Sequence, residues 1–267
     1  MALRPPVAIT IAGSDSGGGA GIVADLKTFE AHGVWGTCAI AAVTAQNTEG
    51  VQGFETVDVG LVRSQVSSVA SDIGIDAAKT GMLASAELVR AVAVAVTEAG
   101  IERLVVDTVF VSKHGDTLLA DDAVGALRER LLPLATVVTP NLPEAARLVG
   151  FAIADRAAMA RAGQVLVGLG AEVALVKGGH LGGADSPDCL VVNGAAPVWL
   201  EAPRMPGRHT HGTGCVLSAA ICAELARGME PADACVAAKH FTERAIAAGM
   251  ELGRGVGPVN PGWERMT

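Results

Sequence analysis

The sequence predicts a three-layer α/β fold, in which helices cover both faces of a largely parallel sheet. Apolar segments of strand length alternate with segments of helical periodicity through most of the 267 residues, which is typical of parallel sheets with helical crossovers. The chain is also half apolar, yet it has 33 glycines and no tyrosine. That mixture favours helices packed closely on a buried sheet.

The predicted strands are short apolar runs that end at glycine or at a polar residue. The first is VAITIAG at 7–13, and the second, WGTCAIAAVTAQN at 35–47, ends with Gln46 and Asn47. Further strands are expected within 76–83, 102–110, 136–141 and 172–180. The stretch from 183 to 210 is rich in Gly, Pro and Asp, and its pieces CLVVNG and VWLEAP predict a hairpin.

The predicted helices lie between these strands and have apolar residues at helical spacing. Their expected ranges are 19–33, 59–74, 85–100, 121–135, 142–150, 159–170, one from about 212 and one from about 231 to 249. Ser85 is a suitable N-cap, and Pro143 suits the first turn of its helix. Because no linker, repeat or charge block interrupts the pattern, we expect a single domain over residues 1–267.

Charge and cysteine content exclude several classes of protein. The net charge of −8 argues against nonspecific nucleic-acid binding, which needs a basic face. Five cysteines without CxxC spacing indicate reduced thiols. The N-terminal apolar run is too short for a signal peptide or a membrane span. We therefore expect a soluble cytoplasmic protein that binds neither nucleic acid nor membrane.

A glycine-rich turn, AGSDSGGGAGIVADLK at 12–27, connects the first strand to the first helix. It does not fit a Walker phosphate loop, because no lysine follows the glycines until Lys27. A dinucleotide fingerprint would need an acidic residue at the end of the second strand, where Gln46 stands instead. The turn is either a flexible connection or a place where the backbone approaches a small ligand. Gln46 and Asp25 would then read polar groups of that ligand.

Polar residues follow three later strands. Asp107 ends VVDTVF, Asn141 and Glu144 lie in TPNLPEA, and Lys177 ends ALVKGGH. Each is weak evidence alone, because a charged residue at a strand end is often only solvated. Together they would place carboxylates for a hydrated Mg²⁺ and a cation for phosphate at one sheet edge.

The string HTHGTGC at 209–215 precedes a long apolar helix. A helix N-terminus offers free N–H groups and partial positive charge, and glycines would let those groups face a phosphoryl group without obstruction. Cys215 would lie in the first turn, where the helix dipole is expected to lower the pKa of its thiol. The alternative is that Cys215 has no catalytic role and is only a small residue that packs beneath the loop. His209 and His211 flank the loop but lack the further ligands that zinc needs.

These strings together resemble the ribokinase superfamily, and within it the hydroxymethylpyrimidine/phosphomethylpyrimidine kinase family of thiamine biosynthesis. The resemblance runs from about residue 7 to 259. Its most specific parts are AQNT, GGHL and THGTGC, supported by AAKTGML and VVDTVFVSKHGDTLL. It implies a ribokinase-like fold and an ATP- and Mg²⁺-dependent phosphotransferase. The expected reactions convert 4-amino-5-hydroxymethyl-2-methylpyrimidine to its monophosphate and then to the diphosphate.

The resemblance also implies a role for each matching position. The pyrimidine pocket corresponds to Gly13, Ala20, Asp25, Gln46, Met82 and Val109. The catalytic loop corresponds to Gly212, Thr213 and Gly214, with Cys215 as the proposed base. The ATP region corresponds to Asp107, Asn141, Glu144, Lys177 and Thr210, with Asp107 and Glu144 as the metal ligands.

Three further expectations accompany this reading. Members of the family are usually dimeric, so a homodimer is expected. A pyridoxal or pyridoxine kinase of the same fold remains an alternative, because Gln46 favours an aminopyrimidine only weakly. A catalytically silent pyrimidine-binding regulator is the second alternative, although the intact GTGC and NxxE motifs argue against it.

Overall fold

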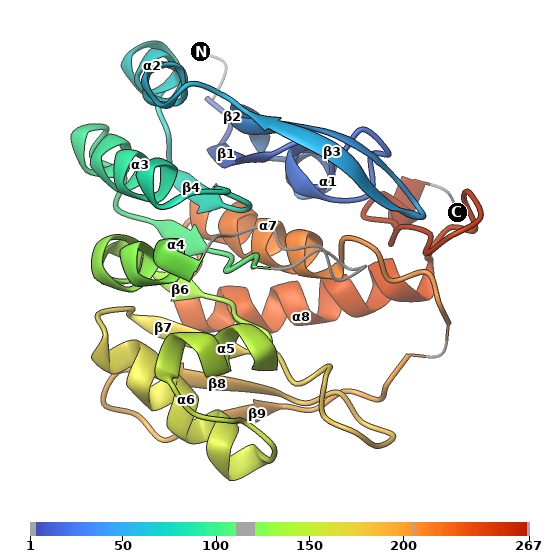
Figure 1. Ribbon diagram of the computed structural model, residues 1–267. Helices are drawn as coiled ribbons and strands as arrows, with labels where there is room; N and C mark the ends of the chain where they lie inside the picture. Colours follow the sequence, from blue (N-terminus) through green and yellow to red (C-terminus); the bar gives the residue numbers. More distant parts are fainter. Residues whose placement is uncertain (1–3, 111–120, 206, 266–267) are drawn as a thin grey trace.

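The computed structural model describes residues 4–110, 121–205 and 207–265. Within them, nine strands form one sheet in the order β3-β2-β1-β4-β5-β6-β7-β8-β9 (Figure 1). The strands are β1 Val7–Gly13, β2 Trp35–Asn47, β3 Gly50–Thr56, β4 Ala77–Thr80, β5 Leu104–Val106, β6 Val137–Val138, β7 Val173–Val176, β8 Asp188–Val192 and β9 Val198–Leu200. The pairs from β2 to β7 are parallel, and β3, β8 and β9 pair antiparallel. The predicted largely parallel sheet is confirmed.

Helices cover both faces of the sheet (Figure 1). One layer consists of α1 Gly21–Ala31, α7 Thr213–Ala226 and α8 Pro231–Ala247. The other consists of α2 Val59–Asp72, α3 Ala86–Glu98, α4 Asp121–Ala126, the π segment η1 Leu127–Leu131, the 3₁₀ turn η2 Leu132–Leu134, α5 Leu142–Val149 and α6 Arg156–Gly168. A last 3₁₀ turn, η3 Trp263–Arg265, lies near the C-terminus.

Each layer has its own apolar core, because successive strand residues face opposite sides of the sheet. In β5, Leu104 and Val106 join the core beneath α2–α6, whereas Val105 joins the core beneath α1, α7 and α8. Helix α7 is buried from Val216 to Leu225. A helix that is apolar on all sides belongs in a protein interior, so the burial of α7 fixes its N-terminal turn against the sheet.

Three elements differ from the sequence-based expectation. Strand β3 was not predicted, because five of its seven residues are exposed and give no alternation of apolar residues. The expected helix 121–135 is divided into α4, η1 and η2, with Pro133 in the last turn. Helix α6 begins earlier than expected, because Asp155 caps it by accepting from the N–H of Ala158 at 2.7 Å.

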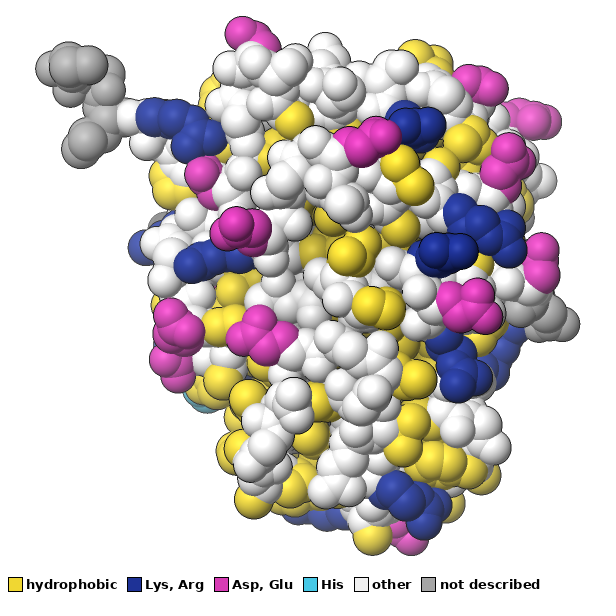
Figure 2. Space-filling model, turned by 90° about the vertical axis from the view of Figure 1, so that its left-hand side faces the viewer, with side chains coloured by type: hydrophobic (Ala, Val, Ile, Leu, Met, Phe, Trp, Pro, Cys, Tyr) yellow, Lys and Arg dark blue, Asp and Glu magenta, His cyan; other side chains and the backbone are white. Residues whose placement is uncertain are grey.

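The predicted hairpin is confirmed as the antiparallel pair β8–β9. Residues 111–119, the second part of VVDTVFVSKHGDTLL, lie outside the described residues. On the face shown in Figure 2, acidic and basic side chains are interspersed among apolar ones, without a broad basic area. Among the described helices, none has the length and apolar character needed to cross a bilayer.

Candidate active site

Most of the predicted site residues lie at the carboxyl ends of the central parallel strands. Gly13 ends β1, Met82 follows β4 and Asp107 follows β5. Asn141 and Lys177 follow β6 and β7 and are joined by an isolated parallel bridge. Because ligands bind beyond this edge of open α/β sheets, the fold gathers these residues where a site is expected.

The carboxylate of Asp15 shapes the glycine-rich turn after β1. Its Oδ1 accepts from the N–H of Gly17 at 2.8 Å. Its Oδ2 accepts from the N–H groups of Gly19 at 3.1 Å and Ala20 at 2.8 Å, and Ala20 is also the N-cap residue of α1. Burial acts to raise the pKa of Asp15, but contacts with His211 and with backbone N–H groups outweigh it and lower the pKa. The turn is therefore organised around a buried, ionised carboxylate.

The string HTHGTGC leads into α7, as predicted. Gly212 is the N-cap with a φ of 81°, a left-handed conformation that favours glycine. A Cβ at Gly212 would also overlap the carbonyl oxygen of Gly19, and a Cβ at Gly214 would lie 3.4 Å from Nζ of Lys177. The first turn of α7 therefore lies between the glycine-rich turn and Lys177. N–H groups of a first helical turn lack intrahelical partners, so this turn is suited to hold an anion.

Thr210 and Thr213 stabilise that turn. The hydroxyl of Thr213 donates to the carbonyl of Thr210 at 2.8 Å, and the N–H of Thr210 donates to the carbonyl of Arg208 at 3.1 Å. These contacts give both threonines a structural role at the entry to α7.

The environment of Cys215 contradicts one expectation. The helix dipole was expected to lower the pKa of its thiol, but burial raises that pKa to about 12. The positive charge of Lys79 and a contact from the N–H of Gly21 offset only part of this effect, and the charges of Asp25 and Asp107 add to it. Desolvation of this half-buried thiol therefore outweighs the helix dipole, and the pKa of Cys215 lies above its ordinary value.

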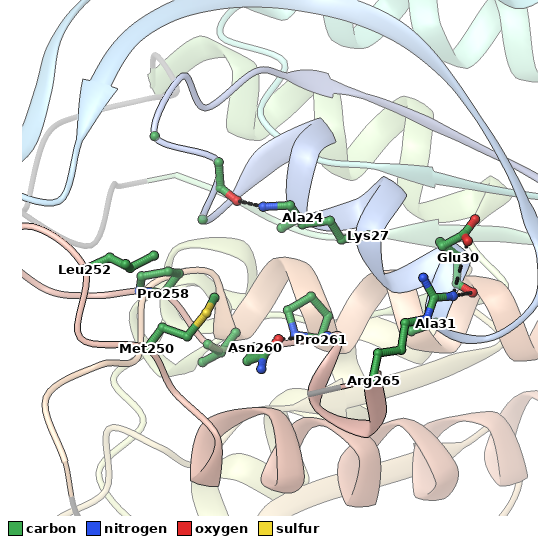
Figure 3. Close-up of a pocket in the computed structure, with 15 residues that line it drawn as sticks. Ala24, Lys27, Glu30, Ala31, Met250, Leu252, Pro258, Asn260, Pro261 and Arg265 are labelled. Carbon is green, nitrogen blue, oxygen red and sulfur yellow. Dashed lines mark hydrogen bonds and ion pairs between the residues drawn. The ribbon is translucent and has the colours of Figure 1, made fainter. Parts of the chain in front are cut away.

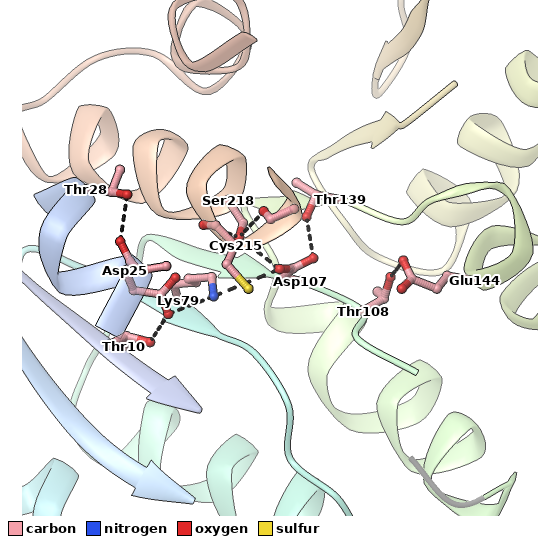
Figure 4. Close-up of polar contacts among 12 residues, drawn as sticks. Thr10, Asp25, Thr28, Lys79, Asp107, Thr108, Thr139, Glu144, Cys215 and Ser218 are labelled. Atoms are coloured by element: carbon pink, nitrogen blue, oxygen red, sulfur yellow. Dashed lines mark hydrogen bonds and ion pairs between the residues drawn. The ribbon is translucent and has the colours of Figure 1, made fainter. Parts of the chain in front are cut away.

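Asp25 also differs from the expectation. Its side chain is fully buried, with Oδ2 2.9 Å from Nζ of Lys79 and accepting from the hydroxyl of Thr10 at 2.6 Å. Burial raises the pKa of Asp25, and Lys79 and Thr10 only partly counter this. Asp25 is thus part of a buried ion pair (Figure 4) and does not offer an accessible oxygen to a ligand.

Asp107 is at the centre of the polar cluster in Figure 4. Its Oδ2 accepts from the hydroxyl of Ser218 at 3.0 Å and lies 4.0 Å from Nζ of Lys79. Its Oδ1 accepts from Thr139 at 3.3 Å and from Lys177 at 3.4 Å. Burial acts to raise the pKa of Asp107, but the two lysines and Ser218 outweigh it and lower the pKa. Asp107 is therefore ionised and held in place.

Asn141 and Glu144 form a capping box at the start of α5. Oδ1 of Asn141 accepts from the N–H of Glu144 at 2.9 Å, and Oε2 of Glu144 accepts from the N–H of Asn141 at 2.8 Å. The same Oε2 accepts from the hydroxyl of Thr108 at 2.9 Å. Burial raises the pKa of Glu144, and Lys177 only partly counters this. The NxxE motif thus fixes a buried carboxyl group beside the end of β5.

Met82 and Val109, the residues expected to form the apolar walls of the pyrimidine pocket, lie close together. Met82 packs with Ala42 in a small cluster that includes Val109. The N–H of Gly13 donates to the carbonyl of Met82 at 3.1 Å, and a Cβ on Gly13 would lie 3.3 Å from the sulfur of Met82. Because Gly13 has no side chain, the space beside Met82 stays open.

Gln46 lies on the same side of the sheet as the α7 turn. Its side-chain nitrogen is 3.4 Å from Nε2 of His211, the residue before Gly212. The expected proximity of Gln46 to the start of α7 is therefore observed.

The residues expected to bind metal fit a hydrated Mg²⁺. Among the described residues, no group of three or more His, Cys, Asp or Glu side chains is placed to hold a metal ion. Asp107 and Glu144 instead offer two carboxyl groups that both interact electrostatically with Lys177. Mg²⁺ in phosphoryl-transfer sites uses one or two carboxylates together with waters and phosphate oxygens, and this pair is compatible with that chemistry.

Several residues of the site were not singled out from the sequence, among them Asp15, Lys79 and His211. Lys79 lies in the quoted string AAKTGML, and a lysine in a fully apolar strand was a signal that it is paired. His211 was noted only as a possible zinc ligand, although its side chain is buried and 2.8 Å from Asp15. The sequence did not show which distant side chain each would meet.

A separate cavity of about 230 Å³ lies between α1 and the C-terminal segment (Figure 3). Its walls include Lys27, Met250, Pro258 and Arg265, together with the backbone of the glycine-rich turn. It contains none of the predicted site residues. We place the chemistry at the sheet edge, because the paired charges and the helix N-terminus are there.

Comparisons with known proteins agree with this geometry. The sequence model of the family described as "Phosphomethylpyrimidine kinase" matches residues 15–260. A hydroxymethylpyrimidine/phosphomethylpyrimidine kinase from Streptomyces coelicolor is 52% identical, over 98% of this chain and 96% of that protein. Another, from Rhizobium meliloti, is 51% identical, over 95% of this chain and 96% of that protein.

Solved structures of two kinds of kinase share this fold. A Bacillus subtilis pyridoxal kinase in complex with ADP has a TM-score of 0.91 and 38% identity, covering 98% of this chain and all of that one. A phosphomethylpyrimidine kinase from Clostridium difficile has a TM-score of 0.79 and 39% identity, covering 90% of this chain and 99% of that one. This chain belongs to the phosphomethylpyrimidine kinase family, and the resemblance seen in the sequence is confirmed.

Proposed function

We propose that this chain transfers the γ-phosphoryl group of ATP to the hydroxymethyl group of 4-amino-5-hydroxymethyl-2-methylpyrimidine, and then phosphorylates the monophosphate to the diphosphate. The relatives named for these two activities cover nearly the whole chain. The observation that carries the proposal is the first turn of α7, which lies between the Asp15-centred turn and Lys177. In this proposal the whole chain acts as one kinase domain.

The acceptor alcohol lies beside Gly13 and Met82, with Gln46 near the polar edge of its ring. The backbone N–H groups of 212–215 and the ammonium group of Lys177 bind the migrating phosphoryl group. Such groups stabilise the charge of a loose transition state because they are fixed before the reaction begins. Alignment of the alcohol with the γ-phosphoryl group of ATP raises the rate further.

Asp107 and Glu144 would hold Mg²⁺ through its waters and the phosphates. When bound, the ion neutralises charge on the phosphate oxygens. Lys177 hydrogen-bonds to Asp107, and its pKa is raised because Asp107 and Glu144 outweigh the effect of burial. The lysine therefore stays charged when phosphate approaches.

The thiolate form of Cys215, whose own proton has first left to solvent, is proposed to accept the proton of the alcohol late in the transfer. Its raised pKa makes the thiolate a minor species in the free protein. In a loose transition state the alcohol needs little activation, so removal of its proton can follow most of the phosphorus–oxygen rearrangement. We therefore assign Cys215 a smaller share of the rate than the groups that bind the phosphoryl unit.

The test is product analysis by mass spectrometry after incubation with ATP, Mg²⁺ and the aminopyrimidine alcohol. Monophosphate and diphosphate products are expected. Absence of any phosphorylated product, together with absence of pyrimidine-dependent ATP consumption, would refute the kinase proposal and favour the silent regulator.

Pyridoxal phosphorylation is a second candidate, because pyridoxal kinases share this fold at a TM-score of 0.91. Values of kcat/KM for both alcohols would rank the two activities, and we expect the aminopyrimidine to be preferred. We also propose a homodimer, tested by analytical ultracentrifugation. A cytoplasmic location is proposed because all five cysteines are free thiols.

A further inference from the structure

Lys177 lies where β7 ends and the chain turns away from the sheet. Its N–H donates to the carbonyl of Pro140 at 2.8 Å. The next residue, Gly178, packs so closely that a Cβ there would overlap the carbonyl oxygen of Pro187. Because each amide is planar, the two amides that flank the Cα of Lys177 set the direction in which its side chain leaves the backbone.

Asp188 holds the second of these amides. Its Oδ1 accepts from the N–H of Gly178 at 2.8 Å, and that N–H is part of the amide that joins Lys177 to Gly178. Asp188 is the first residue of β8, which pairs antiparallel with β7 and places Cys189 opposite Val176. The sheet therefore fixes the backbone of Asp188 beside the end of β7, and the carboxylate reaches the turn from there.

Lys239 of α8 holds that carboxylate in its orientation. Nζ of Lys239 is 2.8 Å from Oδ2 of Asp188 and also donates to the carbonyl of Ser186 at 3.0 Å. Asp188 and Lys239 are almost fully buried, and α8 packs against β7 and β8 (Figure 1). Desolvation offsets most of the attraction within a buried ion pair, so the main contribution of this pair is the fixed direction of the carboxylate.

The ammonium group of Lys177 has a defined place between β5 and α7. Its Nζ is 3.4 Å from Oδ1 of Asp107, and a Cβ at Gly214 would lie 3.4 Å from the same Nζ. A lysine ammonium is at the end of a flexible four-carbon stem, so a change in the direction of the Cα–Cβ bond is carried to the charged group. A displacement of about 1 Å in a catalytic group can cost about 10²-fold in rate.

We infer that Asp188, oriented by Lys239, is a positioning residue that directs Lys177 toward the first turn of α7. This inference rests on the proposed function, in which Lys177 binds the migrating phosphoryl group. Asp188 and Lys239 act through the backbone of Gly178 and not by touching a ligand. Loss of the oxygen that accepts from Gly178 should therefore slow phosphoryl transfer and leave the pyrimidine pocket on the β1–β2 side unchanged.

The test compares two double variants, in which Lys239→Met is combined with Asp188→Leu or with Asp188→Asn. Both remove the ion pair, so neither leaves a charge buried alone, but only asparagine keeps an oxygen that can accept from Gly178. The leucine variant is expected to lower the single-turnover rate of phosphoryl transfer by roughly 10–10²-fold. The asparagine variant should stay within about threefold of wild type, and KM for the pyrimidine should not change in either. Equal rates in the two variants would overturn the inference.

A purely structural defect would lower the rate whether or not Lys177 is present. The same two variants are therefore also made together with Lys177→Met, where the ammonium group is already absent. In that background they should transfer the phosphoryl group at equal rates, and a remaining tenfold difference would contradict the positioning role. Glu201→Gln is the control, because it breaks an exposed ion pair with Arg156 just after β9. A rate loss in this control as large as in the leucine variant would also contradict the inference.

A second measurement does not depend on turnover. Hydrogen exchange followed by NMR should show the amide proton of Gly178 protected in the wild-type protein and in the asparagine variant. In the leucine variant this proton should exchange roughly tenfold faster, because its acceptor is lost. Rapid exchange in the wild-type protein would refute the positioning role even if the kinase activity is found. If the wild-type protein fails to phosphorylate the aminopyrimidine but the exchange pattern is observed, the proposed function fails and the contact between Gly178 and Asp188 stands.

Discussion

Replacement of Lys79 by methionine tests whether the buried charges of the site depend on one another. Nζ of Lys79 is 2.9 Å from Asp25 and 4.0 Å from Asp107, and the lysine side chain is 0% exposed. With an effective dielectric constant of about 20, these separations correspond to gross attractions of about 6 and about 4 kcal/mol. Desolvation offsets part of this gain, and loss of one partner from a buried pair costs about 3–5 kcal/mol.

We therefore expect Lys79→Met to lower the free energy of unfolding by about 3–5 kcal/mol, measured by urea denaturation followed by circular dichroism. The matched control is Asp25→Asn combined with Lys79→Met, which removes the charge left alone in the single variant. Because side chains in contact are energetically coupled, the double variant should regain about 2 kcal/mol relative to Lys79→Met. If the loss of unfolding free energy in the double variant equals the sum of the losses in Lys79→Met and Asp25→Asn, the two side chains are not coupled and the reasoning about this pair is wrong.

Three other changes have expected results. Cys215→Ala should lower kcat by roughly 10²-fold or more with KM for ATP unchanged, in steady-state assays, and an unchanged kcat would remove the base role. With the thiol pKa at about 12, wild-type kcat should rise with pH without a plateau below pH 10, and Cys215→Ala should lose that rise. Gly212→Ala should destabilise the protein in thermal melts, because the new Cβ overlaps Gly19 and strains a φ of 81°, whereas Gly125→Ala, in open space, is its control. Asp15 has a lowered pKa, so its stabilisation should be present above its ordinary value of 3.8 and lost as the pH falls through its lower folded value. The stability difference between wild type and Asp15→Asn should therefore shrink below pH 4, and a constant difference would contradict this.

Much of the fold followed from local pattern in the sequence. Runs such as VAITIAG form the buried parallel strands. Apolar strand segments therefore alternate with helical segments along the sequence, and this alternation is easy to recognise. Strand β3 was missed because it lies at the sheet edge and only Gly50 of its seven residues is buried. It pairs with β2 across a two-residue turn at 48–49, but GVQGFET lacks the alternation of apolar residues that predicts a strand.

The site was predictable to the extent that it depends on strand ends. Asp107 and Lys177 were expected at one sheet edge because the carboxyl ends of parallel strands meet there, and the structure places them 3.4 Å apart. The charge states were not predictable in the same way. Cys215 begins a helix, which suggested a lowered pKa, but its burial near Asp25 and Asp107 reverses the direction. Burial and long-range pairing are properties of the folded chain.

The most direct test of the account is a crystal structure with ADP, Mg²⁺, aluminium fluoride and the aminopyrimidine alcohol, in which the fluoride group stands for the migrating phosphoryl group. The account predicts this group about 2.7–3.1 Å from backbone nitrogens in the 212–215 turn and in contact with Lys177, with the alcohol oxygen beside Cys215. A fluoride group bound away from the α7 N-terminus, or an alcohol on the opposite side of the sheet from Gln46, would contradict it.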